Sequence, residues 1–207
     1  MIRIFWITFL LLPGCAFVEL RDVPEIASEI FFVESIDIDK EYFDQRSFSF
    51  AKFSQGRRSQ AVGVLLSINN NIYEWFLGNN ERIFTKHGKI IKTENLERNF
   101  VIQDTRNVLH PNKSHNYEVI AALSNPDAYT SIAYDWAFKK EEEVTLINSH
   151  ITKKYSEKFS AEGLYWKNIF WRKQNTYWVD ADTQRVIMSH QHIHPYAKPI
   201  KIEFYYK

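Results

Sequence analysis

The sequence predicts a single, mainly β domain built from antiparallel strands. Apolar residues recur with a period of two along most of the chain, a pattern typical of strands that bury one face. Turn residues separate these runs at short intervals, as they do in meanders. The composition agrees, because 6 Gly against 16 Phe, 11 Tyr and 6 Trp favours sheet. A chain of 207 residues can bury such a core without disulfides.

The chain begins with a segment typical of an export signal. Arg3 precedes the apolar run 4–12, which Pro13 and Gly14 end. The run is too short to span a membrane, which needs about 20 apolar residues. Its length and basic flank are those of a signal peptide. The alternative, a buried strand or helix of the domain, leaves the N-terminal position and the Arg flank unexplained.

Residues 12–15 (LPGC) resemble the bacterial lipobox, in which a Cys follows Leu and two small residues. Pro13 departs from the usual Ala or Ser. The resemblance implies cleavage before Cys15 and attachment of acyl chains to it. Each buried CH₂ contributes about 0.8 kcal/mol, so several chains would hold the protein on a bilayer. We therefore predict a signal peptide at residues 1–14, lipid attachment at Cys15 and a lipidated tether at residues 15–22.

Residue Ala16 and the charge balance set the expected location. By the same resemblance, Ala16 in place of Asp after the Cys implies an outer-membrane anchor with the body facing the periplasm. Removal of residues 1–14 takes away only Arg3 and leaves 25 basic and 25 acidic residues. A neutral body has no electrostatic footprint for nucleic acid, and it stays at the membrane through its acyl chains. A single Cys excludes an internal disulfide framework.

The body is expected to form one domain over residues 23–207. A short helix is expected within residues 17–32, and alternating acidic and apolar residues predict a strand at 34–40. The clearest pattern follows at residues 72–93, where Asn and Gly turns divide β-branched runs into a three-stranded meander. The predicted strands after the first are residues 61–68, 72–77, 82–85, 89–93, a hairpin of 128–138 with 144–152 around 139–143, then 165–171, 176–180, 185–189 and 200–206.

Two segments carry motifs in a fixed order. The first is Trp75 with residues 84–96 (FTKHGKIIKTENL). The second comprises residues 168–171 (NIFW), 177–180 (YWVD) and 186–191 (VIMSHQ), followed by Pro195. With the lipobox, they resemble the YjbF/GfcB family of capsule and exopolysaccharide lipoproteins, whose patterns include T-x-x-G-R/K-I/L-V/I-x-T-x-x-L and S-x-Q-x-x-x-P.

The sequence departs from the family pattern at two turns. Gln184 stands where Gly is commoner, and residues 94–95 (EN) stand where a pair such as Ser-Gly is expected. Otherwise the resemblance spans nearly the whole chain.

The resemblance implies a curved antiparallel meander sheet, half-barrel-like, with one or two short helices. It implies a non-catalytic outer-membrane lipoprotein that supports capsule or exopolysaccharide assembly or secretion, without a cofactor or metal. Its partners would be the membrane, through Cys15, and either the polysaccharide or an export-pore protein. An alternative from another class is a lipid or lipoprotein carrier whose half-barrel shelters an acyl chain.

Trp75, Trp171 and Trp178 are the candidate glycan contacts. Aromatic rings on a concave sheet can stack on sugar rings, and the polar residues 172–174 lie between Trp171 and Trp178. The alternative is that these side chains fill the core of the sheet, because each buries a large area.

His190, His192 and His194 alternate along an expected strand, so their side chains would share one face. The first and third would lie about 13 Å apart, which prevents all three from binding one ion. A pair with a neighbouring carboxylate could hold Zn²⁺ or Cu²⁺ in a metal-dependent enzyme; the alternative is a solvated polar face.

Asp180 and Asp182 form either a carboxylate pair or a hairpin turn, and Asp favours turns through its bonds to the backbone. The sequence contains no phosphate loop or HExxH motif, and we expect no enzymatic activity.

Overall fold

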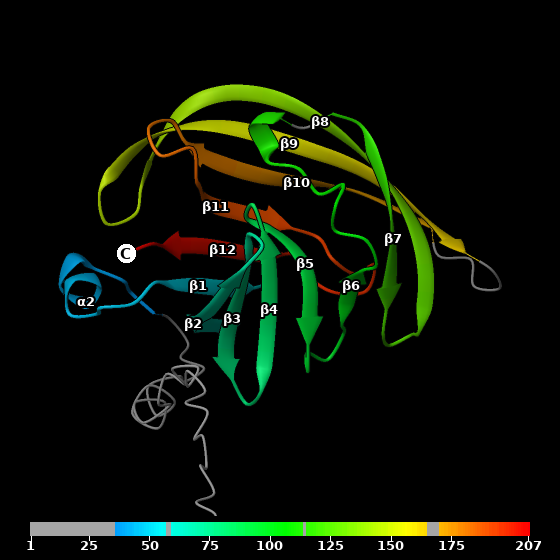
Figure 1. The fold of residues 1–207 in the computed structure, drawn as a ribbon, viewed down its shortest axis with the longest axis horizontal. Coiled ribbons are helices and arrows are strands. Elements are labelled where there is room, and N and C mark those ends of the chain that lie inside the picture. Colours follow the sequence, from blue (N-terminus) through cyan, green and yellow to red (C-terminus); the bar gives the residue numbers. More distant parts are fainter. Residues whose placement is uncertain (1–35, 57–58, 114, 165–169) are drawn as a thin grey trace, which may run out of the picture.

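The computed structural model describes residues 36–56, 59–113, 115–164 and 170–207. In this part of the chain, antiparallel strands form one sheet that closes into a barrel (Figure 1). The elements in chain order are α2 (Lys40–Asp44), β1 (Phe50–Gln55), β2 (Ser59–Asn69), β3 (Ile72–Gly78), β4 (Glu81–Lys86), β5 (Lys89–Glu94), β6 (Phe100–Ile102), the 3-10 turn η2 (Pro111–Lys113), β7 (Tyr117–Leu123), β8 (Ala128–Thr145), β9 (Ser149–Leu164), β10 (Phe170–Asp180), β11 (Val186–Gln191) and β12 (Ile200–Tyr205).

The strand order is an up-and-down meander closed between its first and last strands. From β2 to β12 each strand pairs with its neighbours in sequence, and β1 pairs with both β2 and β12. Phe53 therefore faces Ala61 on one side and Ile202 on the other. The expected mainly β antiparallel meander is confirmed. The half-barrel description is only roughly compatible, because the β1–β12 pairing closes the sheet.

The long hairpin is confirmed, but its turn is not at residues 139–143. β8 continues through these charged residues to Thr145, and residues 146–148 connect it to β9. Glu141 lies opposite Lys153, and Lys154 Nζ approaches Glu142 Oε1 to 3.2 Å. Opposite charges across a strand pair stabilise it, so a run of Lys and Glu can remain extended where both faces meet solvent.

The strand predicted at residues 34–40 is wrong for its described part. Residues 36–39 have no regular structure, and α2 begins at Lys40. Asp39 is the N-cap of this helix, because its Oδ1 accepts a hydrogen bond from the Tyr42 backbone N–H at 2.7 Å. The expected signal peptide, Cys15 and the helix within residues 17–32 lie outside the described residues. Strands β1, β6 and β7 were not among the expected strands.

Side chains from alternate strand positions fill the barrel. The interior cluster includes Trp75, Ile83, Ile132, Tyr177 and Ile202, each at most 1% exposed. This follows from a period of two, since every second residue of each strand points inward. Among the described residues, no helix is long and apolar enough to cross a membrane.

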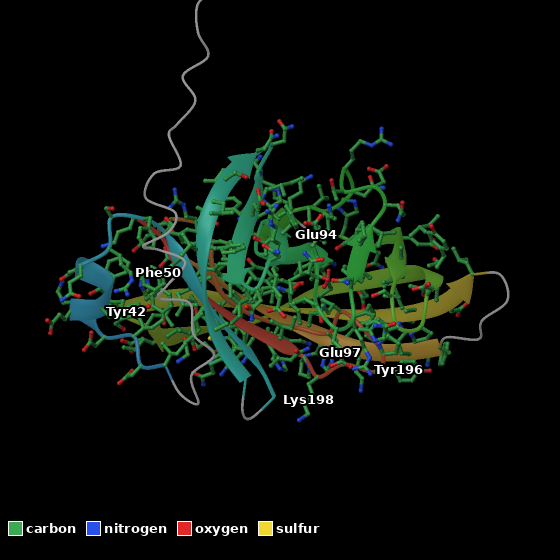
Figure 2. The ribbon with its side chains drawn as sticks, turned by 90° about the horizontal axis from the view of Figure 1, so that it is seen from below. Tyr42, Phe50, Glu94, Glu97, Tyr196 and Lys198 are labelled. Atoms are coloured by element: carbon green, nitrogen blue, oxygen red, sulfur yellow. The ribbon has the colours of Figure 1, made fainter. Side chains whose placement is uncertain are left out.

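A second, smaller cluster lies outside the barrel wall under α2. Phe50 and Tyr205 stack there with ring centroids 5.0 Å apart, and Tyr42 from α2 packs edge-on against Phe50 at 5.6 Å (Figure 2). Leu146 and Ile147, from the tip of the β8–β9 hairpin, cover the same cluster. The hairpin tip and the helix therefore close one side of the molecule together.

Candidate functional site

The two sequence motifs meet inside the barrel. Gln191, at the end of β11, donates from Nε2 to the Gly88 carbonyl (2.8 Å) and to Ser189 Oγ (2.9 Å). Its Oε1 accepts from the Ile90 backbone N–H at 2.9 Å. This one side chain therefore ties β11 to β5 across the interior.

A buried ion pair lies beside this junction. Lys89 Nζ is 2.5 Å from Glu157 Oε1, and the two side chains are 4% and 0% exposed. Lys89 also donates to Tyr117 Oη at 2.6 Å and lies 3.2 Å from the centre of the Tyr134 ring. The ammonium is thus held by a carboxylate, a hydroxyl and an aromatic face.

The carboxylate of Glu157 is fully hydrogen-bonded. Oε1 accepts from Tyr117 Oη at 2.9 Å, and Oε2 accepts from Asn175 Nδ2 (2.7 Å) and Tyr177 Oη (3.0 Å). These donors come from β7 and β10, and with Lys89 on β5 the carboxylate is held by three strands. A buried charge requires such partners, because an unpaired one is strongly unfavourable.

Burial dominates the electrostatics of this network. It lowers the pKa of Lys89 to about 8, although Glu157 opposes the shift. Burial, together with the negative charge of Glu157, raises the pKa values of Tyr134 and Tyr177 well above 10. Since both charged groups are enclosed and bonded to the protein, this arrangement joins strands and offers no open position for a substrate.

A hollow with a volume of about 850 Å³ lies on the outer face of β7–β10. Its lining takes three consecutive residues from each of β8, β9 and β10, and Tyr117 and Glu118 of β7 with the preceding Asn116. The central residues of the four triplets are Tyr117, Tyr134, Phe159 and Lys173. These four share the inward face of their strands, so their neighbours point outward and form the walls. We call this hollow the β7–β10 groove; its outward residues are Asn116, Glu118, Ala133, Asp135, Lys158, Ser160, Arg172 and Gln174.

The acidic and basic side chains of the β7–β10 groove lie on opposite sides of it. Glu118 on β7 and Asp135 on β8 carry the acidic groups, while Lys158 on β9 and Arg172 on β10 carry the basic groups. Ala133 lies between them and is exposed. The groove therefore presents hydrogen-bond donors and acceptors on either side of the small apolar side chain of Ala133.

The structure places the three candidate Trp residues differently. Trp75 is 0% exposed and donates from Nε1 to Thr85 Oγ1 at 2.9 Å, and Trp171 is 6% exposed with its ring edge-on against Phe159 at 4.7 Å. Both fill the core and present no free ring face. Trp178 is half-buried on the outer face of β10, beneath Lys154 Nζ at 4.7 Å, and donates to Glu142. Only Trp178 retains surface for a glycan.

The three histidines do not form one row. β11 ends at Gln191, so only His190 lies in the strand. The rings of His190 and His192 are 5.8 Å apart, whereas His194 is 1% exposed and packs against Tyr196. Burial lowers the pKa of His192 to about 4, with His190 and Lys173 adding to the shift. In the described part of the chain, no group of three or more His, Cys, Asp or Glu is placed to hold a metal ion.

Asp180 belongs to a turn. Its Oδ1 accepts from the Thr183 backbone N–H and Oγ1, both at 2.7 Å, and its Oδ2 lies 2.8 Å from His150 Nδ1. Burial alone would raise the pKa of Asp180, but these hydrogen bonds outweigh it and lower the pKa. Asp182 is exposed. The turn interpretation therefore accounts for Asp180.

Sequence reasoning missed both Glu157 and the β7–β10 groove. A signal existed for the ion pair, since Lys89 directly precedes the apolar residues 90–91 at the start of β5, within the first motif. The groove residues are ordinary surface types, and only the strand register assembles them.

Comparison with known proteins gives a family match and several solved structures that resemble this chain. The YjbF family model, described as group 4 capsule polysaccharide lipoprotein gfcB, YjbF, matches residues 26–205. No curated protein matches the chain.

Two crystal structures are similar. The hypothetical lipoprotein YmcC from Escherichia coli K12 is 18% identical with a TM-score of 0.66, over 81% of this chain and 88% of YmcC. A presumed lipoprotein from Parabacteroides distasonis is 10% identical with a TM-score of 0.40, over 78% of this chain and 95% of its own. At these identities the likeness to YmcC shows the fold alone.

Proposed function

The chain belongs to the YjbF family of group 4 capsule polysaccharide lipoproteins, and from this premise we propose that it is a non-catalytic envelope lipoprotein that supports capsule assembly or secretion. The observation that carries the proposal is the family match over residues 26–205, which includes the whole barrel. It acts by contacting either the polymer or a protein of the export pore.

The proposed anchor is a set of acyl chains on Cys15 that holds the protein at the outer membrane, facing the periplasm. The lipobox-like residues 12–15 and the following Ala16 support this location. The first described residues are fixed to the barrel wall, because the Ile36 backbone N–H donates to Gln60 Oε1 (2.8 Å) and Lys52 Nζ donates to the Ile36 carbonyl (2.5 Å). A tether from the membrane would therefore reach the body at β1 and β2.

A non-catalytic role is consistent with how the buried charges are used. Lys89 and Glu157 are enclosed by side chains that hydrogen-bond to them, as expected of groups that specify a fold. The alternative acyl-chain carrier is not favoured, since Trp75 and Tyr177 are 0% exposed within a filled interior.

The experiment is complementation of a deletion strain with the wild-type gene, Cys15→Ala and Ala16→Asp. We expect palmitate label only on the proteins that keep Cys15, and surface capsule to return with the wild type and not with Cys15→Ala. Membrane fractionation should place the wild type in the outer membrane and Ala16→Asp in the inner membrane. Equal label on wild type and Cys15→Ala would contradict the anchor, and normal capsule in the deletion strain would contradict the role in capsule assembly.

A further inference from the structure

The β7–β10 groove is shallow and open to solvent, and it has the volume of a ligand site. Its volume of about 850 Å³ falls within the range of about 300–1,000 Å³ typical of such sites. It crosses four strands, which at a spacing of about 4.8 Å makes it about 14 Å wide. A groove of this width holds a short segment of a chain molecule.

Three polar side chains along the groove are free for a ligand, whereas Glu118 Oε1 already accepts a hydrogen bond from Ser131 Oγ. The Asp135, Lys158 and Gln174 side chains are exposed, and the structure gives them no hydrogen-bond partner among the described residues. Asp135 and Lys158 are directly opposite each other on β8 and β9, yet they do not form an ion pair. Their donors and acceptors are therefore satisfied by solvent and can be exchanged for those of a ligand.

The charge pattern fits a ligand that both donates and accepts hydrogen bonds. The carboxylates of Glu118 and Asp135 only accept, whereas Lys158 and the Arg172 guanidinium only donate. The two acids balance the two bases, so the groove does not select for a polyanion such as nucleic acid. Sugar hydroxyls supply both functions, and adjacent hydroxyls suit the paired oxygens of a carboxylate and the fork of Arg.

An aromatic ring borders the groove on its own face. Phe170 is 60% exposed and lies two residues from Arg172 on the outer side of β10, with the Arg172 guanidinium 4.9 Å from the ring centre. Trp178 lies on the same side, four residues beyond Gln174. Apolar ring faces beside polar groups match a sugar, which has hydroxyls at its rim and C–H groups on its faces.

A peptide strand is a poorer match. An extended peptide gains most of its affinity by adding to a free sheet edge. Across the middle of the groove, β8 and β9 are paired with neighbouring strands on both edges. The outer edges of β7 at residues 117–120 and of β10 at residues 170–175 have no strand partner among the described residues, but they lie at the two ends of the groove. Between these ends the groove offers side chains and not backbone groups for recognition.

We infer that the β7–β10 groove binds an oligosaccharide segment of the capsule polymer, with Glu118, Asp135, Lys158 and Arg172 as its polar contacts and Phe170 as its stacking surface. This inference rests on the proposed function and chooses the polymer, rather than a protein, as the partner at this face. Ala133 is a small outward residue in the wall of the groove, so a large side chain there would project into the site.

The test measures binding of oligosaccharides prepared by partial hydrolysis of the capsule made by the strain that encodes this chain. The full chain, purified from membranes in detergent, is titrated by calorimetry as wild type, Ala133→Trp, Arg172→Ala and Ala137→Trp. Ala137 is the matched control, because it is exposed on the same face of β8 but lies outside the groove. Circular dichroism establishes that each variant is folded.

We expect binding by the wild type and Ala137→Trp, and a loss of at least about tenfold in affinity for Ala133→Trp and Arg172→Ala. Undiminished binding by Ala133→Trp, or equal loss in Ala137→Trp, would place the binding site elsewhere and overturn the inference. If no form binds the oligosaccharides but the deletion strain lacks capsule, the groove inference fails while the proposed function stands. If Ala133→Trp then also abolishes capsule, the groove serves a protein partner.

Discussion

Lys89 and Glu157 are charged residues that lie in the buried interior of the barrel. An ammonium and a carboxylate are buried together, and each is stable there only because the other is present. We predict that Lys89→Met destabilises the fold by about 3–5 kcal/mol, because it leaves the Glu157 charge unpaired. Chemical denaturation of the full chain in detergent measures this loss.

The double variant separates pairing from packing. Lys89→Met/Glu157→Gln removes both charges and keeps the side-chain volumes, so we expect it to be more stable than the sum of the single variants predicts. Additive losses would show that the two groups act independently, contrary to their 2.5 Å separation.

Gly88 occupies a position that another residue fits poorly. Its φ is +76°, and a Cβ at this position would lie 2.5 Å from the Cβ of Val186. We predict that Gly88→Ala destabilises the protein by about 2–4 kcal/mol, from the left-handed backbone and from overpacking. Thermal unfolding followed by circular dichroism measures the change.

Gly56 provides the control for Gly88. Its φ is +71°, but a Cβ there would meet Cδ of Lys198, a flexible exposed side chain that can move. Gly56→Ala should therefore lose only about 1 kcal/mol, the backbone part of the effect. Equal losses at both positions would indicate that Val186 gives way and that overpacking contributes nothing.

At the scale of the element, the β8–β9 hairpin acts as a cover as well as a wall. Leu146 at its tip is half-buried against the cluster under α2, whereas Ile151 on the same hairpin is 58% exposed. We predict that Leu146→Ala destabilises the protein by about 1–2 kcal/mol, while Ile151→Ala changes stability by less than about 0.5 kcal/mol.

Hydrogen exchange locates this effect. In Leu146→Ala the amides of α2 and the hairpin tip should exchange faster, with the barrel interior unchanged. Faster exchange throughout the barrel would contradict a local covering role.

The elements that sequence predicted well are those with explicit turns. Strands β3–β5 agree with the expected meander within a few residues, because their turns contain residues that adopt positive φ: Asn79, Asn80, His87 and Gly88. The turn of the β8–β9 hairpin was misplaced for the opposite reason. Residues 139–143 are all charged, as is common in loops. Because both faces of this part of β8 are in solvent, the sequence there has no hydrophobic period that would identify a strand.

The departures from the family pattern also have a structural meaning. Asn95 and Gln184 stand where glycine-containing turns are expected, and both adopt positive φ, +61° and +57°. Asn tolerates this conformation through its short side chain. Gln184 is held there by hydrogen bonds, since its Nε2 donates to the Ala181 carbonyl and its Oε1 accepts from Asn112.

The candidate site was largely beyond sequence reasoning. Glu157 is 68 residues from Lys89, and the pairing of β9 with β10 decides that its carboxylate faces Asn175. A one-residue change of register would turn it to the opposite face. The groove depends on the same register, because it aligns outward residues of four strands that share no motif.

At the scale of the whole molecule, the proposed anchor and the proposed binding face lie on different walls. The chain reaches the barrel at β1 and β2, and β8 lies about halfway around the closed strand order from them (Figure 1). A body tethered at β1 and β2 would therefore present the β7–β10 groove away from its attachment. This arrangement leaves the groove accessible to a polymer while the protein remains at the membrane.

The whole molecule is also predicted to lose stability in acid. Burial lowers the pKa values of five histidines: His87, His110, His190, His192 and His194. An unfolded chain binds protons at these groups as the pH falls below about 6.5, whereas the folded protein binds them only at lower pH. The contribution of these histidines to stability is therefore complete above about pH 6.5 and decreases toward pH 4.

The histidine with the largest shift provides the test. His192 has a pKa of about 4, and it is half-exposed, so we expect His192→Gln to reduce the loss between pH 7 and pH 5 by on the order of 1 kcal/mol. Thermal unfolding at several pH values, with the exposed His115→Gln as control, measures this difference. If His192→Gln and the wild type lose equal stability over this range, His192 does not contribute to the acid sensitivity. The folded protein would then bind a proton at His192 as readily as the unfolded chain does.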